Sequence, residues 1–73
     1  MLLKDMKINS EGVIVDINCR EEVKKRLMDI GLIKGVRIRL AGVAPLGDPI
    51  MISLRGFNLA IRKFDAGRIT VSL

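Results

Sequence analysis

The sequence predicts a mainly β fold, a small and partly closed β-barrel of about five strands with one α-helix between the first two. Three observations predict it. The 73 residues suffice for one domain, near the lower size limit at which a single core supports a fold. Five short stretches alternate apolar and polar residues with period two, as half-buried strands do. One stretch with helical spacing follows the first of them. Residues 1–73 are therefore predicted to form a single domain.

The alternating stretches supply five apolar triplets, each predicted to face a common interior. They are Val13, Val15 and Ile17; Val36, Ile38 and Leu40; Ile50, Ile52 and Leu54; Phe57, Leu59 and Ile61; and Ile69, Val71 and Leu73. This pattern places Phe57 in the core, and Phe64 is predicted to close the core. Closing the sheet into a barrel would hide strand edges that could otherwise pair with neighbouring molecules.

The helix is predicted over about residues 20–30. Its apolar stripe is Val23, Leu27 and Ile30, spaced i, i+4 and i+7. Gly31 is predicted to end it, because glycine adopts the left-handed conformation that stops a helix, and Leu32 is placed to make the accompanying apolar contact.

At the start of this helix, Asn18 or Cys19 is placed at the N-cap, and Asn18 with Glu21 would form a variant of the capping box. Residues 63–67 are predicted to form one short helical turn before the last strand. The order strand, helix, three strands, turn, strand is that of a small SH3-like barrel. An OB-fold fits less well, since its helix usually lies between the third and fourth strands.

The composition predicts a cytoplasmic protein with an anionic partner. The longest apolar runs span only a few residues, whereas crossing a bilayer takes roughly 20, so no insertion into a membrane is expected. The single cysteine cannot form an internal disulfide, as suits a reducing compartment. The net charge is +5 and the pI about 10.0. Such a charge attracts nucleic acid, lipid headgroups or acidic proteins, and does not by itself choose among them.

The residues offer little for catalysis or metal binding. The chain has no histidine and no phosphate-binding GxxxxGK[ST] stretch, so an enzyme is not expected. Cys19 with Glu21 or Glu22 would make at most a weak metal site, so no metal site and no cofactor are predicted. A position at a helix start could lower the pKa of the Cys19 thiol, which leaves a reactive thiol as the alternative to a structural one.

A nucleic-acid-binding barrel is the main competitor from another class. Its phosphate contacts would come from Arg37, Arg39, Arg55, Arg62 and Arg68. Proteins that bind single strands stack bases on exposed rings, and aromatic residues make up only 3% of this chain. With both phenylalanines placed in the core, a solvated and mildly basic surface is expected, and no DNA or RNA partner.

Four segments carry a resemblance to a known family. They are residues 26–35 (RLMDIGLIKG), residues 44–49 (APLGDP), Gly56-Phe57 and Asp65-Ala66. In this order they resemble the FeoA family, small cytoplasmic proteins of ferrous iron transport in bacteria and archaea. The resemblance covers nearly the whole chain and is most specific over residues 26–62. A Pro-Gly commonly precedes the first strand in that family, whereas residues 8–12 (INSEG) take its place here.

The resemblance implies a non-enzymatic accessory protein of ferrous iron uptake that docks on the cytoplasmic face of the GTP-dependent transporter FeoB and modulates it. Docking would use the surface of the helix and the 43–49 hairpin. The residues expected to contact the partner are Lys24, Lys25, Met28, Asp29, Pro45, Leu46 and Asp48. One alternative is a free-standing regulatory module like the C-terminal domain of metal-dependent repressors, and the other is the nucleic-acid-binding barrel. Weak homo-oligomers could form through an exposed strand edge.

Overall fold

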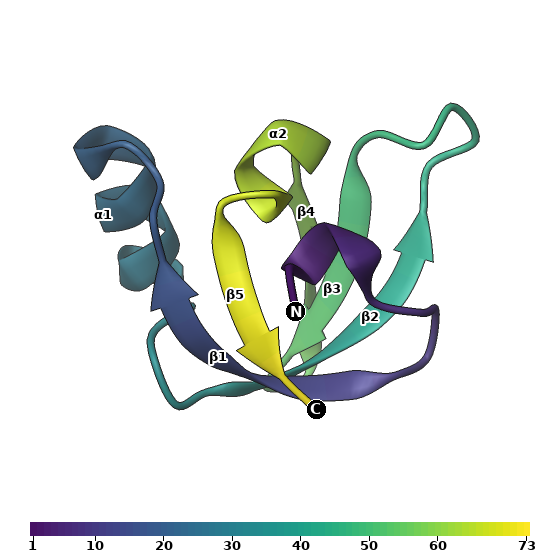
Figure 1. Cartoon of the computed structure of the whole chain (residues 1–73), viewed down its shortest axis with the longest axis horizontal. Helices are drawn as coiled ribbons and strands as arrows, with labels where there is room; N and C mark the ends of the chain where they lie inside the picture. Colours follow the sequence, from purple (N-terminus) through teal and green to yellow (C-terminus); the bar gives the residue numbers. More distant parts are fainter.

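Five antiparallel strands form one strongly curved sheet, with α1 at one side of it (Figure 1). The computed structural model describes all residues, 1–73. Its elements are the 3-10 helix η1 (Leu3–Asp5), β1 (Glu11–Ile17), α1 (Glu21–Ile30), β2 (Arg37–Val43), β3 (Ile50–Leu54), β4 (Phe57–Ile61), α2 (Lys63–Ala66) and β5 (Ile69–Ser72). The predicted order of five strands, with a helix after the first and a helical turn before the last, is confirmed.

The order of strands in the sheet is β4-β3-β2-β1-β5. β1 pairs with β2, β2 with β3 and β3 with β4, and β5 returns to pair with β1. The register shifts twice, between Ile14 and Asp16 of β1 and between Leu40 and Gly42 of β2. Each shift places an extra residue on one strand, and such bulges bend a strand. They therefore help a five-stranded sheet to curve around its own core.

The core contains 17 buried residues, all of them hydrophobic. The predicted triplets at the centre of the sheet are confirmed. Their buried members are Val36, Ile38, Leu40, Ile50, Ile52 and Leu54. From α1 the core receives Val23 and Leu27 of the predicted stripe, whereas Ile30 is 37% exposed. No polar side chain is buried, so burial of apolar surface is the main favourable term for folding.

The predicted inward face of β1 is wrong in its first half. The prediction placed Val13, Val15 and Ile17 inward, but the structure buries Ile14 and Ile17 and leaves Val15 48% exposed. Val15 is the extra residue of the bulge against β5. An added residue reverses the alternation of faces, so Ile14 and Ile17 both face inward although they are three residues apart.

Both phenylalanines were wrongly assigned to the core. Phe57 is 43% exposed and Phe64 is 74% exposed. Phe57 begins β4, an outer strand of the sheet, and of its triplet only Ile61 is buried while Leu59 is partly so. In α2 the residue that faces the core is Ala66. Leu73 lies beyond the end of β5 and is 72% exposed, which also corrects its assignment.

The two ends of α1 compare differently with the prediction. Its N-cap is Arg20, without a side-chain cap, so the placement of Asn18 or Cys19 there is wrong. The main chain of Asn18 is instead engaged with residue 68, donating its N–H to the Arg68 oxygen at 2.8 Å and accepting from Arg68 Nε at 3.0 Å. The helix therefore begins after Asn18, beyond the residues that are hydrogen-bonded to Arg68.

The predicted stop of α1 at Gly31 is confirmed. Gly31 is left-handed, with φ of 109°, and its N–H donates to the Met28 oxygen at 3.0 Å. The N–H of Leu32 donates to the Leu27 oxygen at 2.9 Å, and Leu32 is fully buried. This pair of bonds and the apolar contact make a Schellman motif. It turns the chain at the end of the helix and directs it toward β2.

Residues at the beginning of the chain cover the outer side of β5. The Met1 amine donates to the Val71 oxygen at 2.9 Å, and the Val71 N–H donates to the Met1 oxygen at 2.8 Å. Leu2 forms a bridge to Thr70, and Leu3 is fully buried. No pattern in the sequence predicts this segment. No helix of the structure combines the length and the apolar character that crossing a membrane requires.

Candidate docking surface

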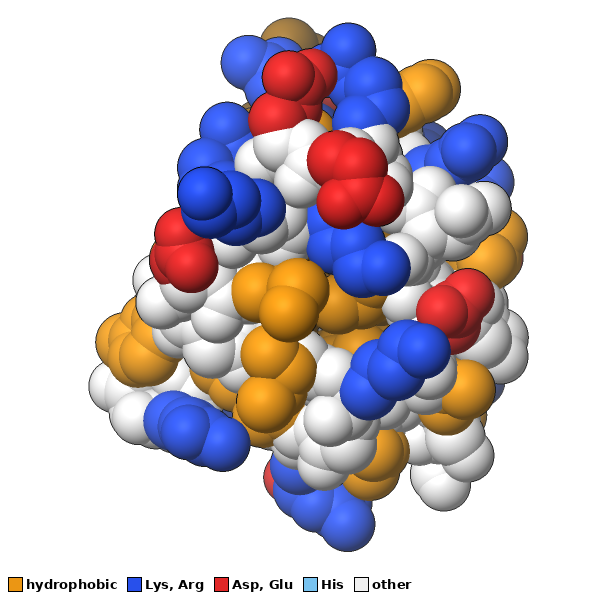
Figure 2. Space-filling view, turned by 90° about the vertical axis from the view of Figure 1, so that its left-hand side faces the viewer, with side chains coloured by type: hydrophobic (Ala, Val, Ile, Leu, Met, Phe, Trp, Pro, Cys, Tyr) orange, Lys and Arg blue, Asp and Glu red, His pale blue; other side chains and the backbone are white.

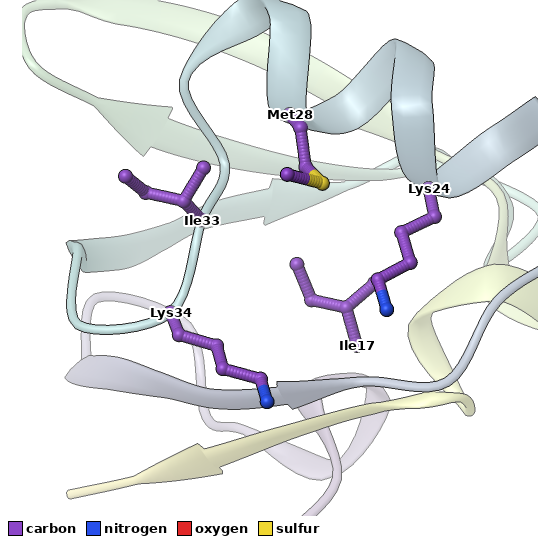
Figure 3. A pocket seen from close by; sticks show the side chains of 5 residues that line it. All are labelled: Ile17, Lys24, Met28, Ile33 and Lys34. Carbon is purple, nitrogen blue, oxygen red and sulfur yellow. The ribbon is translucent and has the colours of Figure 1, made fainter. Parts of the chain in front are cut away.

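An open hollow of about 400 Å³ lies beside α1. It is lined by Ile17, Lys24, Met28, Ile33 and Lys34 (Figure 3). Lys24 and Met28 come from one side of α1, Ile33 and Lys34 from the segment between Gly31 and β2, and Ile17 from the end of β1. The Schellman turn at Gly31 folds this segment back beside the helix, so the stop that the sequence predicts also builds one wall of the hollow.

The floor of the hollow is apolar and partly open to solvent. Met28 is 49% exposed and Ile33 is 40% exposed, while Ile17 beneath them is buried. Figure 2 shows apolar side chains gathered near the middle of the face that carries α1, with lysine and arginine side chains around them. A contiguous exposed apolar patch with a polar rim is typical of a site where another molecule docks.

The rim of the hollow is basic. Lys34 Nζ lies 3.7 Å from Asp16 Oδ1, and both side chains are more than half exposed. Lys24 forms no ion pair. Since an exposed ion pair is worth little in water, both ammonium groups remain available to a carboxylate on a partner. The hollow thus fits an apolar side chain that has acidic neighbours.

The structure divides the predicted contact residues between two regions. Lys24 and Met28 line the hollow, and Lys25 and Asp29 are exposed on the same helix. Residues 44–49, which contain the other three, form the loop between β2 and β3 on the opposite side of the molecule (Figure 1). The two predicted groups therefore do not form one continuous surface.

The loop residues differ among themselves. Leu46 is 97% exposed, and Pro45 is exposed beside it. Asp48 was expected to contact a partner, and in the structure its Oδ1 accepts the main-chain N–H of Lys63 at 2.9 Å. Asp48 thereby joins the loop to the first residue of α2. This bond gives Asp48 a structural role within the fold.

Sequence reasoning missed three residues of the hollow. Ile17 was assigned to the core, where most of it lies, and only its edge reaches the hollow. Ile33 and Lys34 follow Leu32, which is fully buried. Neither residue belongs to a periodic stretch, so no pattern distinguished the exposed Ile33 from the buried leucine before it. The available signal was the glycine stop, which returns the following residues to the side of the helix.

Cys19 lies near this surface but has the properties of a structural thiol. Burial raises the pKa of the Cys19 thiol, and the nearby Asp65 carboxylate raises it further, against smaller opposing effects of Arg68 and Lys24. Its Sγ is 3.7 Å from the main-chain oxygen of Asp65, which accepts the S–H. The expectation of a lowered pKa at a helix start is wrong. No three His, Cys, Asp or Glu side chains come together in a way that could hold a metal ion.

Comparisons with known proteins identify the family. The family model described as FeoA domain matches residues 1–73. The chain is 32% identical to an Fe(2+) transport protein A/Fe(2+) transporter FeoB fusion protein of Porphyromonas gingivalis, over all of the chain but only 9% of that protein. It is 29% identical to a putative Fe(2+) transport protein A of Campylobacter jejuni, over all of the chain and 99% of that protein.

Solved structures agree with this match. The chain superposes on the FeoA protein of Chlorobium tepidum with a TM-score of 0.96 and 34% identity, covering 100% of this chain and 70% of that one. FeoA of Stenotrophomonas maltophilia, described as an SH3 domain protein, gives a TM-score of 0.84 at 22% identity and covers 99% of this chain and 89% of that one. The second likeness shows the fold alone, and it confirms the predicted SH3-like architecture. The chain belongs to the FeoA family, which is involved in Fe(2+) transport.

Proposed function

We propose that the protein is a non-enzymatic, cytoplasmic accessory protein of ferrous iron uptake that docks on the transporter FeoB and modulates it. The observation that carries this proposal is the relative from Porphyromonas gingivalis, in which an FeoA part and an FeoB part share one chain. Joining two proteins in one chain keeps each at high effective concentration near the other, which is useful when they act together.

The hollow beside α1 is the docking face that the geometry favours. It combines exposed apolar side chains with two ammonium groups, whereas the 44–49 loop offers one exposed leucine without a surrounding hollow. Apolar anchors that fill such hollows supply most of the binding energy of an interface, and complementary charge speeds the encounter. The partner surface would be acidic, in keeping with the net charge of +5.

The chemistry of the chain supports a role without catalysis or cofactor. It has no histidine to carry protons near neutral pH, and the raised pKa of Cys19 keeps that thiol in its poorly nucleophilic form. A docking role requires none of these groups.

Uptake of ferrous iron by cells tests the proposed function. Cells that lack this protein but retain FeoB are expected to take up radioactive ferrous iron more slowly under anoxic conditions, and the wild-type chain is expected to restore the rate. Unchanged uptake in the deletion strain would refute the proposal. The regulatory and nucleic-acid-binding alternatives would then have to be tested.

Binding to the purified cytoplasmic domain of FeoB tests the docking face. Met28→Asp and Lys24→Glu are expected to weaken binding at least about tenfold, because each removes one element of the hollow. Arg26→Glu is the matched charge control, since Arg26 is exposed on the same helix and is neither a predicted contact residue nor part of the lining of the hollow. Leu46→Asp tests the loop separately. Equal binding by the Met28→Asp and wild-type proteins, with the fold intact, would exclude the hollow while leaving docking through the loop open.

A further inference from the structure

Phe64 is the most exposed aromatic side chain, and the fold gives no structural reason for its identity. It is 74% exposed in the four-residue helix α2, where Ala66 alone is buried. Its ring stands between two hollows and lines both. A single exposed ring is common on protein surfaces, so Phe64 is informative only together with the side chains around it.

Cationic side chains surround Phe64. One hollow is lined by Leu2, Lys4, Lys63, Phe64, Gly67 and Arg68, and no carboxylate lines it. The other is lined by Cys19, Arg20, Phe64, Asp65 and Arg68. Lys4, Lys63 and Arg68 form no ion pair, whereas Arg20 pairs with Glu22 at 3.5 Å. The nearby carboxylates are those of Asp65, which is partly withdrawn from solvent, and Asp48, whose Oδ1 accepts the Lys63 N–H. This distribution favours an anionic partner next to the ring.

A second apolar side chain projects at the same end of the molecule. Leu46 is 97% exposed in the β2–β3 loop, and the bond from Lys63 N–H to Asp48 Oδ1 ties this loop to α2. Figure 1 shows the loop and α2 at the same end, away from the C-terminus. We call Lys4, Leu46, Lys63, Phe64 and Arg68 the α2 end.

We propose that the α2 end adsorbs to the surface of an anionic lipid membrane. Phe64 and Leu46 would enter the headgroup region, and Lys4, Lys63 and Arg68 would meet lipid phosphates. Apolar anchors beside several cations are the two signals that together hold a protein at a membrane surface, with each cation contributing a modest electrostatic attraction. The adsorption involves no spanning segment.

Lipid fits these residues better than nucleic acid does. Leu46 has no ring on which a base could stack, and Phe64 is the only ring at this end, whereas single-strand sites usually present several. The hollow beside α1 is lined by none of the residues of the α2 end. An adsorbed molecule could therefore still present that hollow to a protein. The inference does not depend on docking to FeoB, because lipid alone tests it.

Tryptophan fluorescence tests the position of the Phe64 ring. Since the chain contains no tryptophan, a single one introduced there is the only source of this emission. The Phe64→Trp variant should show a blue shift of emission with vesicles of phosphatidylcholine containing about one third phosphatidylglycerol, and little shift with phosphatidylcholine alone. Phe57→Trp is the matched control. Phe57 is partly exposed at the opposite end of β4 from α2, and its variant should show no shift.

Vesicle sedimentation tests the charges and the anchor. Lys4→Gln with Lys63→Gln should weaken binding about fivefold for each cation removed, equivalent to about 1 kcal/mol each. Lys25→Gln with Arg26→Gln removes the same charge from α1 and should weaken binding less. Phe64→Ser should weaken it about tenfold while leaving the circular dichroism spectrum unchanged, since the ring contributes little to the core.

Three results would overturn the proposal. The first is absence of binding to phosphatidylglycerol vesicles, and the second is an equal blue shift from the Phe57→Trp variant. The third is a response of the Phe64→Trp variant to single-stranded RNA without any response to vesicles, which would make the α2 end a surface for stacking bases.

Discussion

The two helices differ in whether the residues that determine them lie within the helix or far away in the chain. α1 has ten residues, two of them in the core, and a glycine stop encoded within its own segment. α2 has four residues, one of them buried, and its first N–H is satisfied by Asp48, which is 15 positions away in the chain. A helix that has a buried apolar stripe and a glycine at its C-terminal end can therefore be predicted from the sequence. A single turn depends on contacts that only the assembled fold supplies.

Removing the buried stripe of α1 should have the largest effect. Leu27→Ala is expected to lower the free energy of unfolding by about 2–5 kcal/mol, because Leu27 is only 4% exposed and its removal leaves a cavity. A domain of this size rarely has more than about 3–5 kcal/mol of stability, so much of the variant should be unfolded. Urea denaturation followed by circular dichroism measures this. Ile30→Ala, at a half-exposed position of the same helix, should cost less than about 1 kcal/mol.

The glycine stop of α1 should rank second. Gly31→Ala is expected to cost about 1–2 kcal/mol, because an alanine would have to adopt a left-handed conformation with φ of 109°. A Cβ at this position would meet no atom within 4 Å, so the cost arises from the backbone alone. Gly42→Ala is the matched control, since that glycine also has open space but no positive φ. Equal midpoints for the two variants would show that the stop does not depend on glycine.

The remote bond to α2 should have a smaller effect. Asp48→Ala removes the acceptor for the Lys63 N–H and is expected to cost about 0.5–2 kcal/mol, as loss of a helix cap does. Amide hydrogen exchange should also speed up at Lys63, the residue that donates this bond. Asp29→Ala removes an exposed carboxylate that makes no hydrogen bond or ion pair, and it should change stability by less than about 0.5 kcal/mol. Unchanged exchange at Lys63 would show that α2 does not need Asp48.

The contact between the two helices should give the most subtle effect. The Cys19 thiol precedes α1 and donates to Asp65 of α2, and its pKa is raised mainly by burial. Alkylation by iodoacetamide should therefore reach half its maximal rate at a higher pH in the folded protein than in urea. The neutral thiol is favoured by the folded state. The thiol therefore contributes stability at pH values below its pKa in the unfolded chain. That contribution is lost as the pH rises through its pKa in the folded protein.

Asp65→Asn refines this last measurement. Removing the carboxylate should lower the pH of half-maximal alkylation only in part, since burial remains the larger cause of the raised pKa. A folded profile that coincides with the profile in urea would contradict the partly buried position of the thiol.

The sequence predicted the parts of the fold that depend on near neighbours. The inward residues around Ile38 and Ile52 alternate regularly because their strands lie inside the sheet, covered on one side throughout. The face of β1 could not be predicted, because the bulge at Val15 arises from its pairing with β5, more than 50 residues later. The exposure of Phe57 depends on the place of β4 at the edge of the sheet, and that of Phe64 on which residue of α2 faces the core.

The candidate site was predicted only in outline. Lys24 and Met28 both line the hollow because residues four apart lie on one face of a helix. The limits of this helix could be predicted from the sequence. The sequence could not separate the loop residues from the helix residues, since the distance between them depends on the curvature of the sheet. Nor could it show that Asp48 is engaged with Lys63.

The first residues of the chain leave the sheet with one open side. Met1 and Leu2 occupy the outer side of β5, while no strand pairs with the outer side of β4. If two molecules were to join strand to strand at β4, that contact would use the free edge of both, and no further copy could be added in the same way. With the outer side of β5 occupied by the first two residues, pairing of strand edges in this way would stop at two molecules.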